Sequence, residues 1–221
     1  MLRCVMQTRG LAWVLLSGVL GTGALLGSAM ALYPGGTWLD PQAPGHDFWR
    51  NFFCDLTQPV GLNGMSNRGA VLGQVGMLGL VFAFVPFWWL LPRLFPEAAS
   101  LGRGVRWAGL VSVVGLVAVP LLPSLRFGLL HTAAVFTACV PAFVAAGCAV
   151  VGLRRWPWLR GLGAVTLLSA VVDAGLYARG MLLRGPTIVL LPALQKVAAL
   201  GLFGWMVGVA LSALRLRERE P

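Results

Sequence analysis

Hydrophobic residues occur in six long runs along this chain, separated by short and more polar connections. A helix needs roughly 20 residues to cross a hydrocarbon core of about 30 Å, and each run is close to that length. Strands of a membrane barrel would be about 10 residues long and would alternate in polarity, unlike these runs. The pattern predicts an all-α polytopic membrane helix bundle, with transmembrane helices over 11–33, 68–91, 105–122, 127–153, 158–181 and 188–214.

The composition indicates that much of the protein surface is in contact with lipid. Of the 221 residues, 58% are hydrophobic and only 11% are charged, whereas a soluble domain carries about 25% charged residues. The connections are short except for one loop, over 34–67. We therefore expect a single membrane domain over 1–221.

The first run also has features of a secretory signal. It follows Arg3 and Arg9 and ends in small residues near Ala29 and Ala31, which is typical of a cleavage site. Its apolar stretch is longer than the roughly 7–15 residues of a signal peptide. We therefore expect it to be retained as a span.

The distribution of positive charge predicts the orientation. Basic residues stay on the cytoplasmic side during insertion. The side that includes both termini carries eleven of them: Arg3, Arg9, Arg93, Arg103, Arg106, Arg154, Arg155, Arg160, Arg215, Arg217 and Arg219. The other side carries five: Arg50, Arg68, Arg126, Arg179 and Arg184. Both termini are thus predicted to be cytoplasmic in a multi-pass protein of the inner membrane. The net charge of +10 is read as a topology signal, and we expect no nucleic-acid partner.

The extracytoplasmic loop contains an amphipathic pattern over 46–56. At helical period, one face carries Phe48, Phe52 and Leu56, and another carries Asp47, Asn51 and Asp55. This pattern predicts a short interfacial helix with its aromatic side chains toward the lipid and its acids toward water. An anchoring lid without further function explains the pattern equally well.

Polar side chains gather in the outer half of the predicted bundle. Asp173 and Lys196 each lie about 12 Å from the outer end of their spans, at 1.5 Å per residue. Because a charge in a membrane costs about 2.5–3.5 kcal/mol on insertion scales, such residues usually pair, and these two are the natural partners. Either they form the floor of a binding cavity or they are a structural salt bridge. The candidate ligand-binding residues are Asn51, Asp55, Gln74, His131, Asp173, Tyr177, Gln195 and Lys196.

Recognisable catalytic motifs are absent from the sequence, including the Gly-x-Ser-x-Gly elbow, His-Glu-x-x-His and the Walker loop. The two histidines, His46 and His131, are too few for a three-histidine zinc site. A metal on His46, Asp47 and Asp55 would have poor geometry because they lie in a loop. We therefore expect no metal site and no cofactor.

A short motif in the loop resembles a known family. Residues 33–36 read Tyr-Pro-Gly-Gly, and the later segment matches a family pattern Asn-x-x-Ser-Asp-Leu-Gly at Asn51, Asp55 and Leu56. The chain therefore resembles bacterial six-span proteins grouped as domain of unknown function 998, which are distantly like the eukaryotic FRAG/DRAM/SFK group. Cys54 replaces the family's Ser and Thr57 replaces its Gly.

The likeness extends more loosely to the six-span layout, to His131 and to the Gln195–Lys196 pair. It implies six helices and a polar extracytoplasmic site centred on Asn51 and Asp55, but no established reaction. The eukaryotic relatives are linked with membrane-lipid organisation, which favours a lipid-related role by analogy.

These observations favour a protein that binds, senses or transports a lipid or small amphiphile from the outer leaflet. Asp173 and Lys196 would hold the polar head, and Asn51 and Asp55 would close over it. One alternative is an enzyme on a lipid head group, with Asp55 or Asp173 as base and His131 as acid. Another is a non-catalytic scaffold. The expected partner is membrane lipid, and a protein partner or homo-oligomer stays open.

Overall fold

The computed structural model describes residues 2–183 and 189–215, and over these residues the chain is helical with no β-strand. The helices are α1 (Leu2–Ala31), α2 (Ala70–Leu90), α3 (Ala99–Leu121), α4 (Ser124–Phe127), α5 (Leu129–Gly152), α6 (Pro157–Leu183) and α7 (Leu191–Arg215). Two short 3₁₀ helices, η1 (Phe53–Thr57) and η2 (Leu91–Leu94), complete the fold.

Six of these helices are long and apolar enough to cross a membrane within the described part of the chain. They fall where the hydrophobic runs predicted them, so the all-α fold and the six-span layout are confirmed. The third begins earlier than expected, at Ala99, and ends at Leu121. The predicted start of the last span, residue 188, lies outside the described residues. Six such helices fit a multi-pass membrane protein.

Proline marks two helix ends at the loop side. Helix α1 ends at Ala31, shortly before Pro34. Helix α3 ends at Leu121, because Leu122, with φ −118° and ψ 71°, precedes Pro123 and a residue before proline is biased away from the helical region. Both ends therefore follow from local sequence.

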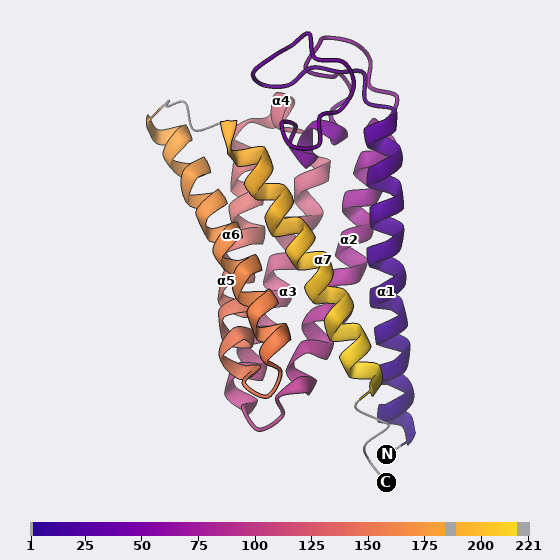
Figure 1. The fold of residues 1–221 in the computed structure, drawn as a ribbon, viewed down its shortest axis with the longest axis vertical. Coiled ribbons are helices and arrows are strands. Elements are labelled where there is room, and N and C mark those ends of the chain that lie inside the picture. Colours follow the sequence, from indigo (N-terminus) through magenta and orange to yellow (C-terminus); the bar gives the residue numbers. More distant parts are fainter. Residues whose placement is uncertain (1, 184–188, 216–221) are drawn as a thin grey trace.

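The helices pack as three antiparallel pairs, α1 with α2, α3 with α5, and α6 with α7, and α1 also contacts α7 (Figure 1). The start of α1 and the end of α7 lie at one end of the bundle, which we call the terminal end (Figure 1). The connections from α2 to α3 and from α5 to α6 lie there too. Residues 34–67 cover the opposite end, which we call the loop end.

An aromatic core fills the terminal half of the bundle. The Phe87 ring centroid lies 4.7 Å from that of Trp88 and 5.3 Å from that of Trp205, and all three side chains are buried. A Cβ on Gly109 would lie 2.3 Å from Cγ of Trp88, so only glycine lets α3 pack this closely on α2. Apolar packing thus holds the terminal half, whereas polar groups collect at the loop end.

Candidate functional site

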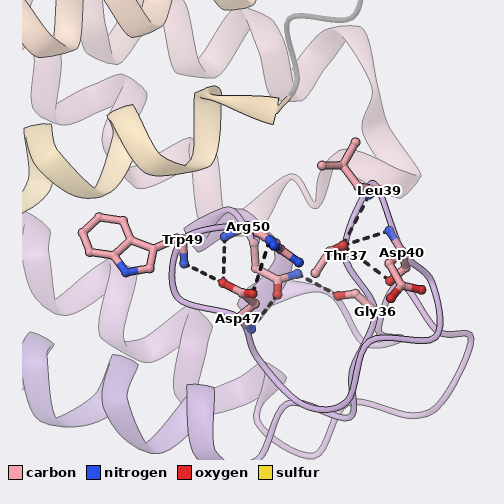
Figure 2. A network of polar contacts seen from close by, with 8 residues as sticks. Gly36, Thr37, Leu39, Asp40, Asp47, Trp49 and Arg50 are labelled. Carbon is pink, nitrogen blue, oxygen red and sulfur yellow. Dashed lines mark hydrogen bonds and ion pairs between the residues drawn. The ribbon is translucent and has the colours of Figure 1, made fainter.

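Two side chains fold the loop over 34–67 into compact turns (Figure 2). The Thr37 hydroxyl accepts the N–H groups of Leu39 and Asp40 at 3.3 and 3.0 Å. The Asp47 carboxylate accepts the N–H groups of Trp49 and Arg50 at 2.9 and 3.1 Å. Short polar side chains favour turns by bonding the backbone two or three residues ahead, so these two turns are set by the local sequence.

The interfacial helix expected over 46–56 is not formed as predicted. A turn at 48–50 leads instead into the five-residue helix η1, which starts at Phe53. The expected polar face is also wrong, because Asn51 and Asp55 are buried and do not face water. Hydrogen bonds to the rest of the loop and to α7 outweigh the amphipathic pattern.

Asn51 is the centre of the loop's polar contacts. Its amide nitrogen donates to the carbonyl of Gly36 at 2.8 Å and to the carboxylate of Asp55 at 3.2 Å. Its side-chain oxygen accepts the N–H of Asp47 at 2.9 Å. The side chain is completely buried, and a buried amide must be paired in this way. Asn51 therefore joins three separate parts of the loop.

Asp55 is almost equally buried, with 3% of its surface exposed. Its carboxylate accepts three hydrogen bonds, from Nε1 of Trp38 at 3.3 Å, the N–H of Phe52 at 2.8 Å and the amide of Asn51. Burial raises the pKa of Asp55, although these hydrogen bonds and the charge of Lys196 act in the opposite direction. All its donors come from the loop itself, so the carboxylate is not presented to a substrate.

Lys196 fastens the loop to α7. Its ammonium donates to the backbone carbonyl of Asn51 at 2.6 Å and lies 4.1 Å from the ring centroid of Phe53 and 5.6 Å from that of Phe48. Cation–π attraction to these rings offsets part of the cost of burying the charge, and the side chain has 0% exposure. The neighbouring Gln195 accepts the N–H of Phe53 at 2.9 Å. We call Asn51, Asp55, Gln195 and Lys196 the latch.

The expected ion pair between Asp173 and Lys196 is not formed. The described residues contain two ion pairs, Asp47 with Arg50 and Glu97 with Arg155, and neither involves these side chains. The lysine bonds the loop instead. Asp173 is half-buried, and one of its carboxylate oxygens is buried without a hydrogen bond.

Two further candidates lie outside the latch. Nδ1 of His131 lies 2.7 Å from the carbonyl of Leu122, where it links the start of α5 to the end of α3. The Tyr177 hydroxyl lies 3.4 Å from that of Thr132. Asp55 bonds within the loop and His131 bonds the end of α3, so these two side chains are not hydrogen-bonded to each other in this structure.

Gln74 lies on a second feature of the loop end. Its amide donates to the carbonyl of Thr57 at 3.3 Å, and its side chain lines a groove of about 640 Å³. The groove runs between the loop, α2 and the α3–α4 connection. Its lining residues are Gln58, Pro59, Val60, Gln74, Pro120, Leu121, Pro123, Leu125, Arg126 and Phe127. Of the eight candidates from sequence, only Gln74 reaches it.

Gln58 is a residue that the sequence analysis missed. It is 2% exposed, and its amide nitrogen donates to the Ser124 hydroxyl at 3.0 Å and to the carbonyl of Cys54 at 3.4 Å. Its amide oxygen is buried and has no hydrogen-bond partner. A glutamine between a helical turn and Pro59 carries no periodic signal, so only the folded loop reveals this group.

Burial also changes the titration of two other loop residues. It lowers the pKa of His46 to about 4, with a smaller contribution from the charge of Lys196, and the His46 ring packs edge-on against Tyr33 at 5.7 Å. It raises the pKa of the Cys54 thiol to about 12. The histidine is therefore neutral and the thiol protonated at neutral pH, so Cys54 is a poor nucleophile.

No protein-family model, curated protein or solved structure matches this chain.

Proposed function

We propose that this chain binds a lipid or small amphiphile from the outer leaflet of the inner membrane, in order to sense, transport or redistribute it. The observation that supports this proposal is the groove of about 640 Å³ at the loop end. Binding pockets for small molecules commonly measure about 300–1,000 Å³ and combine apolar walls with a few polar groups. The lining of this groove has both.

The proposal also includes the orientation of the chain in the membrane. The arginine-rich connections lie at the terminal end, so the positive-inside tendency favours cytoplasmic termini and an extracytoplasmic loop. The groove then opens at the level of the outer head groups. The resemblance to domain of unknown function 998, whose distant relatives are linked with lipid organisation, is consistent with this role by analogy.

The proposal moves the ligand away from the residues first expected to hold it. Asn51, Asp55 and Lys196 are buried and already hydrogen-bonded to one another or to the loop. In this role they keep the loop in place as one wall of the groove, and they do not contact the ligand. The latch is a condition for binding and the groove is the site.

Filling the groove tests this assignment. Leu121 lines it and is 57% exposed, whereas Leu129 is 78% exposed and does not line it. We expect the wild type and Leu121→Trp, extracted in native lipid discs, to differ in a native mass spectrum. The wild type and the control Leu129→Trp should retain a stoichiometric amphiphile that Leu121→Trp loses. Equal retention by both variants, or a wild type without any bound species, would contradict the proposal.

A further inference from the structure

The polar groups of the groove indicate what kind of head group it accepts. Among the described residues, Arg126 is the only charged one in the lining. Neither ion pair among the described residues includes it, and its guanidinium lies 5.3 Å from the ring centroid of Phe127. An exposed guanidinium without a carboxylate partner favours an anionic ligand, because arginine binds phosphate and carboxylate groups through paired N–H donors.

The second group is the buried amide oxygen of Gln58. Its amide nitrogen is held by Ser124 and the backbone of Cys54, so the amide is fixed and the oxygen remains an acceptor without a donor. A buried acceptor without a partner is unfavourable. A ligand that brings an O–H or N–H group to this oxygen relieves that cost, whereas a ligand without a donor leaves it in place.

The remaining lining is apolar. Val60, Leu121 and Leu125 are exposed at the groove, with three prolines and Phe127 beside them. These side chains suit the first part of an acyl chain or a glycerol backbone. No acidic side chain from the described part of the chain lines the groove, so none of its lining residues repels a phosphate.

From these contacts we infer that the ligand is a glycerophospholipid whose head group carries an N–H or O–H donor beside its phosphate. The phosphate binds Arg126, and the donor binds the amide oxygen of Gln58. The inference rests on the proposed function and narrows it. Ethanolamine and glycerol head groups meet the requirement, whereas choline has a phosphate but no donor.

Stepwise methylation of the head-group amine removes its N–H donors but keeps its positive charge. The purified full chain is placed in discs that contain phosphatidylethanolamine, its N,N-dimethyl form, phosphatidylcholine and diacylglycerol with mass-distinguishable acyl chains. The dimethyl form keeps one N–H and phosphatidylcholine keeps none. We expect retention in a native mass spectrum to fall about tenfold at that last methyl group, since a lost buried hydrogen bond is worth roughly a factor of ten.

The phosphate contact is tested with a pair of arginine variants. Arg126→Gln should lose the preference for phosphatidylethanolamine over diacylglycerol, because the phosphate loses its charged partner. Arg68 is an exposed arginine at the same end that does not line the groove, so Arg68→Gln should keep the preference.

The outcomes distinguish this inference from the function on which it rests. Equal retention of the dimethyl and choline lipids overturns the role of Gln58, and an unchanged preference in Arg126→Gln overturns that of Arg126. In both cases a lipid is still retained, and the proposed function survives if Leu121→Trp displaces it. Retention of no lipid by the wild type overturns both.

Discussion

The latch and the groove lie at the same end of the bundle, yet their polar groups are in opposite states. In the latch, the side chain of Asn51 makes three hydrogen bonds and the carboxylate of Asp55 accepts three. In the groove, Arg126 has no ion-pair partner among the described residues and the amide oxygen of Gln58 has no hydrogen bond. The first set is satisfied within the fold, whereas the second is left without such partners.

The difference shows why polarity inside a membrane protein is an incomplete guide to function. Intramembrane ionisable residues are functional candidates by default, and Lys196 fits that description. Its ammonium is nevertheless fully engaged by a carbonyl and two aromatic rings. Its burial therefore serves the attachment of the loop to α7.

The largest expected change in the free energy of loop opening comes from removing the side chain of Asn51, the centre of the latch. Asn51→Ala removes three side-chain hydrogen bonds, so we expect it to lower the free energy of loop opening by about 3 kcal/mol, at about 1 kcal/mol per bond. Hydrogen exchange of residues 46–57, measured by mass spectrometry, reports this opening. The exposed Gln42→Ala should change it by less than about 0.5 kcal/mol. Similar exchange in both variants would refute the central role of Asn51.

A smaller increase in loop opening is expected when Lys196, on the α7 side of the latch, is changed. Lys196→Met keeps the length of the side chain but leaves the carbonyl of Asn51 without its donor, at a cost of about 1–3 kcal/mol. Removal of a buried charge offsets part of this cost, so we expect the variant to fold with a loop that opens about tenfold more often. Protection equal to that of the wild type would show that the lysine does not hold the loop.

Acid should loosen the loop through His46. Its pKa is lowered to about 4 in the folded protein from an ordinary 6.5, so the neutral form is favoured by folding. This contribution to stability is complete above pH 6.5 and is lost as the pH falls toward 4. Asp55 has the opposite sign, because its raised pKa favours the loop when the carboxyl group is protonated.

The variant His46→Phe separates these two contributions. It keeps an aromatic ring against Tyr33 but does not titrate, and Asp55 is present in both proteins. We expect the wild type to lose loop protection relative to the variant between pH 6.5 and pH 4. A difference between the two proteins that does not change with pH would contradict this role of His46.

The smallest change in loop opening is expected at Gln74, where the latch and the groove meet. Gln74 lines the groove, but its one hydrogen bond to the loop, at 3.3 Å, is long. Gln74→Met should therefore change loop opening by about 0.5 kcal/mol or less. Hydrogen exchange of 46–57 in this variant, compared with Asn51→Ala, measures how separate the latch and the groove are. A large increase in exchange would show that they act as one unit.

Sequence reasoning predicted the six-span layout because long apolar runs admit few other structures in lipid. It also selected Asn51, Asp55, Gln195 and Lys196, which do meet in space. It failed on the partner of Lys196, which bonds the backbone of the loop and not Asp173. A rise of 1.5 Å per residue gives the depth of Asp173 and Lys196, but which way each side chain points depends on neighbours that a sequence does not show.

The loop was the least predictable part of the site. A repeat over 46–56 predicted a helix, yet Asp47 forms a local turn and η1 follows it. Gln195 accepts the N–H of Phe53 and Lys196 donates to the carbonyl of Asn51, and both lie more than 140 positions further along the chain. Gln58 and Arg126 carry no pattern of their own. Their roles arise from the fold, because the loop and the α3–α4 connection are brought together only in three dimensions.

Helix η1 joins the two regions covalently, and this has a thermodynamic consequence. The N–H of Phe53 at its start is held by Gln195, and Gln58, which follows its last residue, forms a wall of the groove. A ligand that fits only the docked loop must stabilise docking by RT ln(1 + [L]/Kd). By reciprocity, weakening the latch lowers the affinity of such a ligand only by the factor by which the docked fraction falls, so a well-docked loop tolerates a weaker latch with little loss of binding.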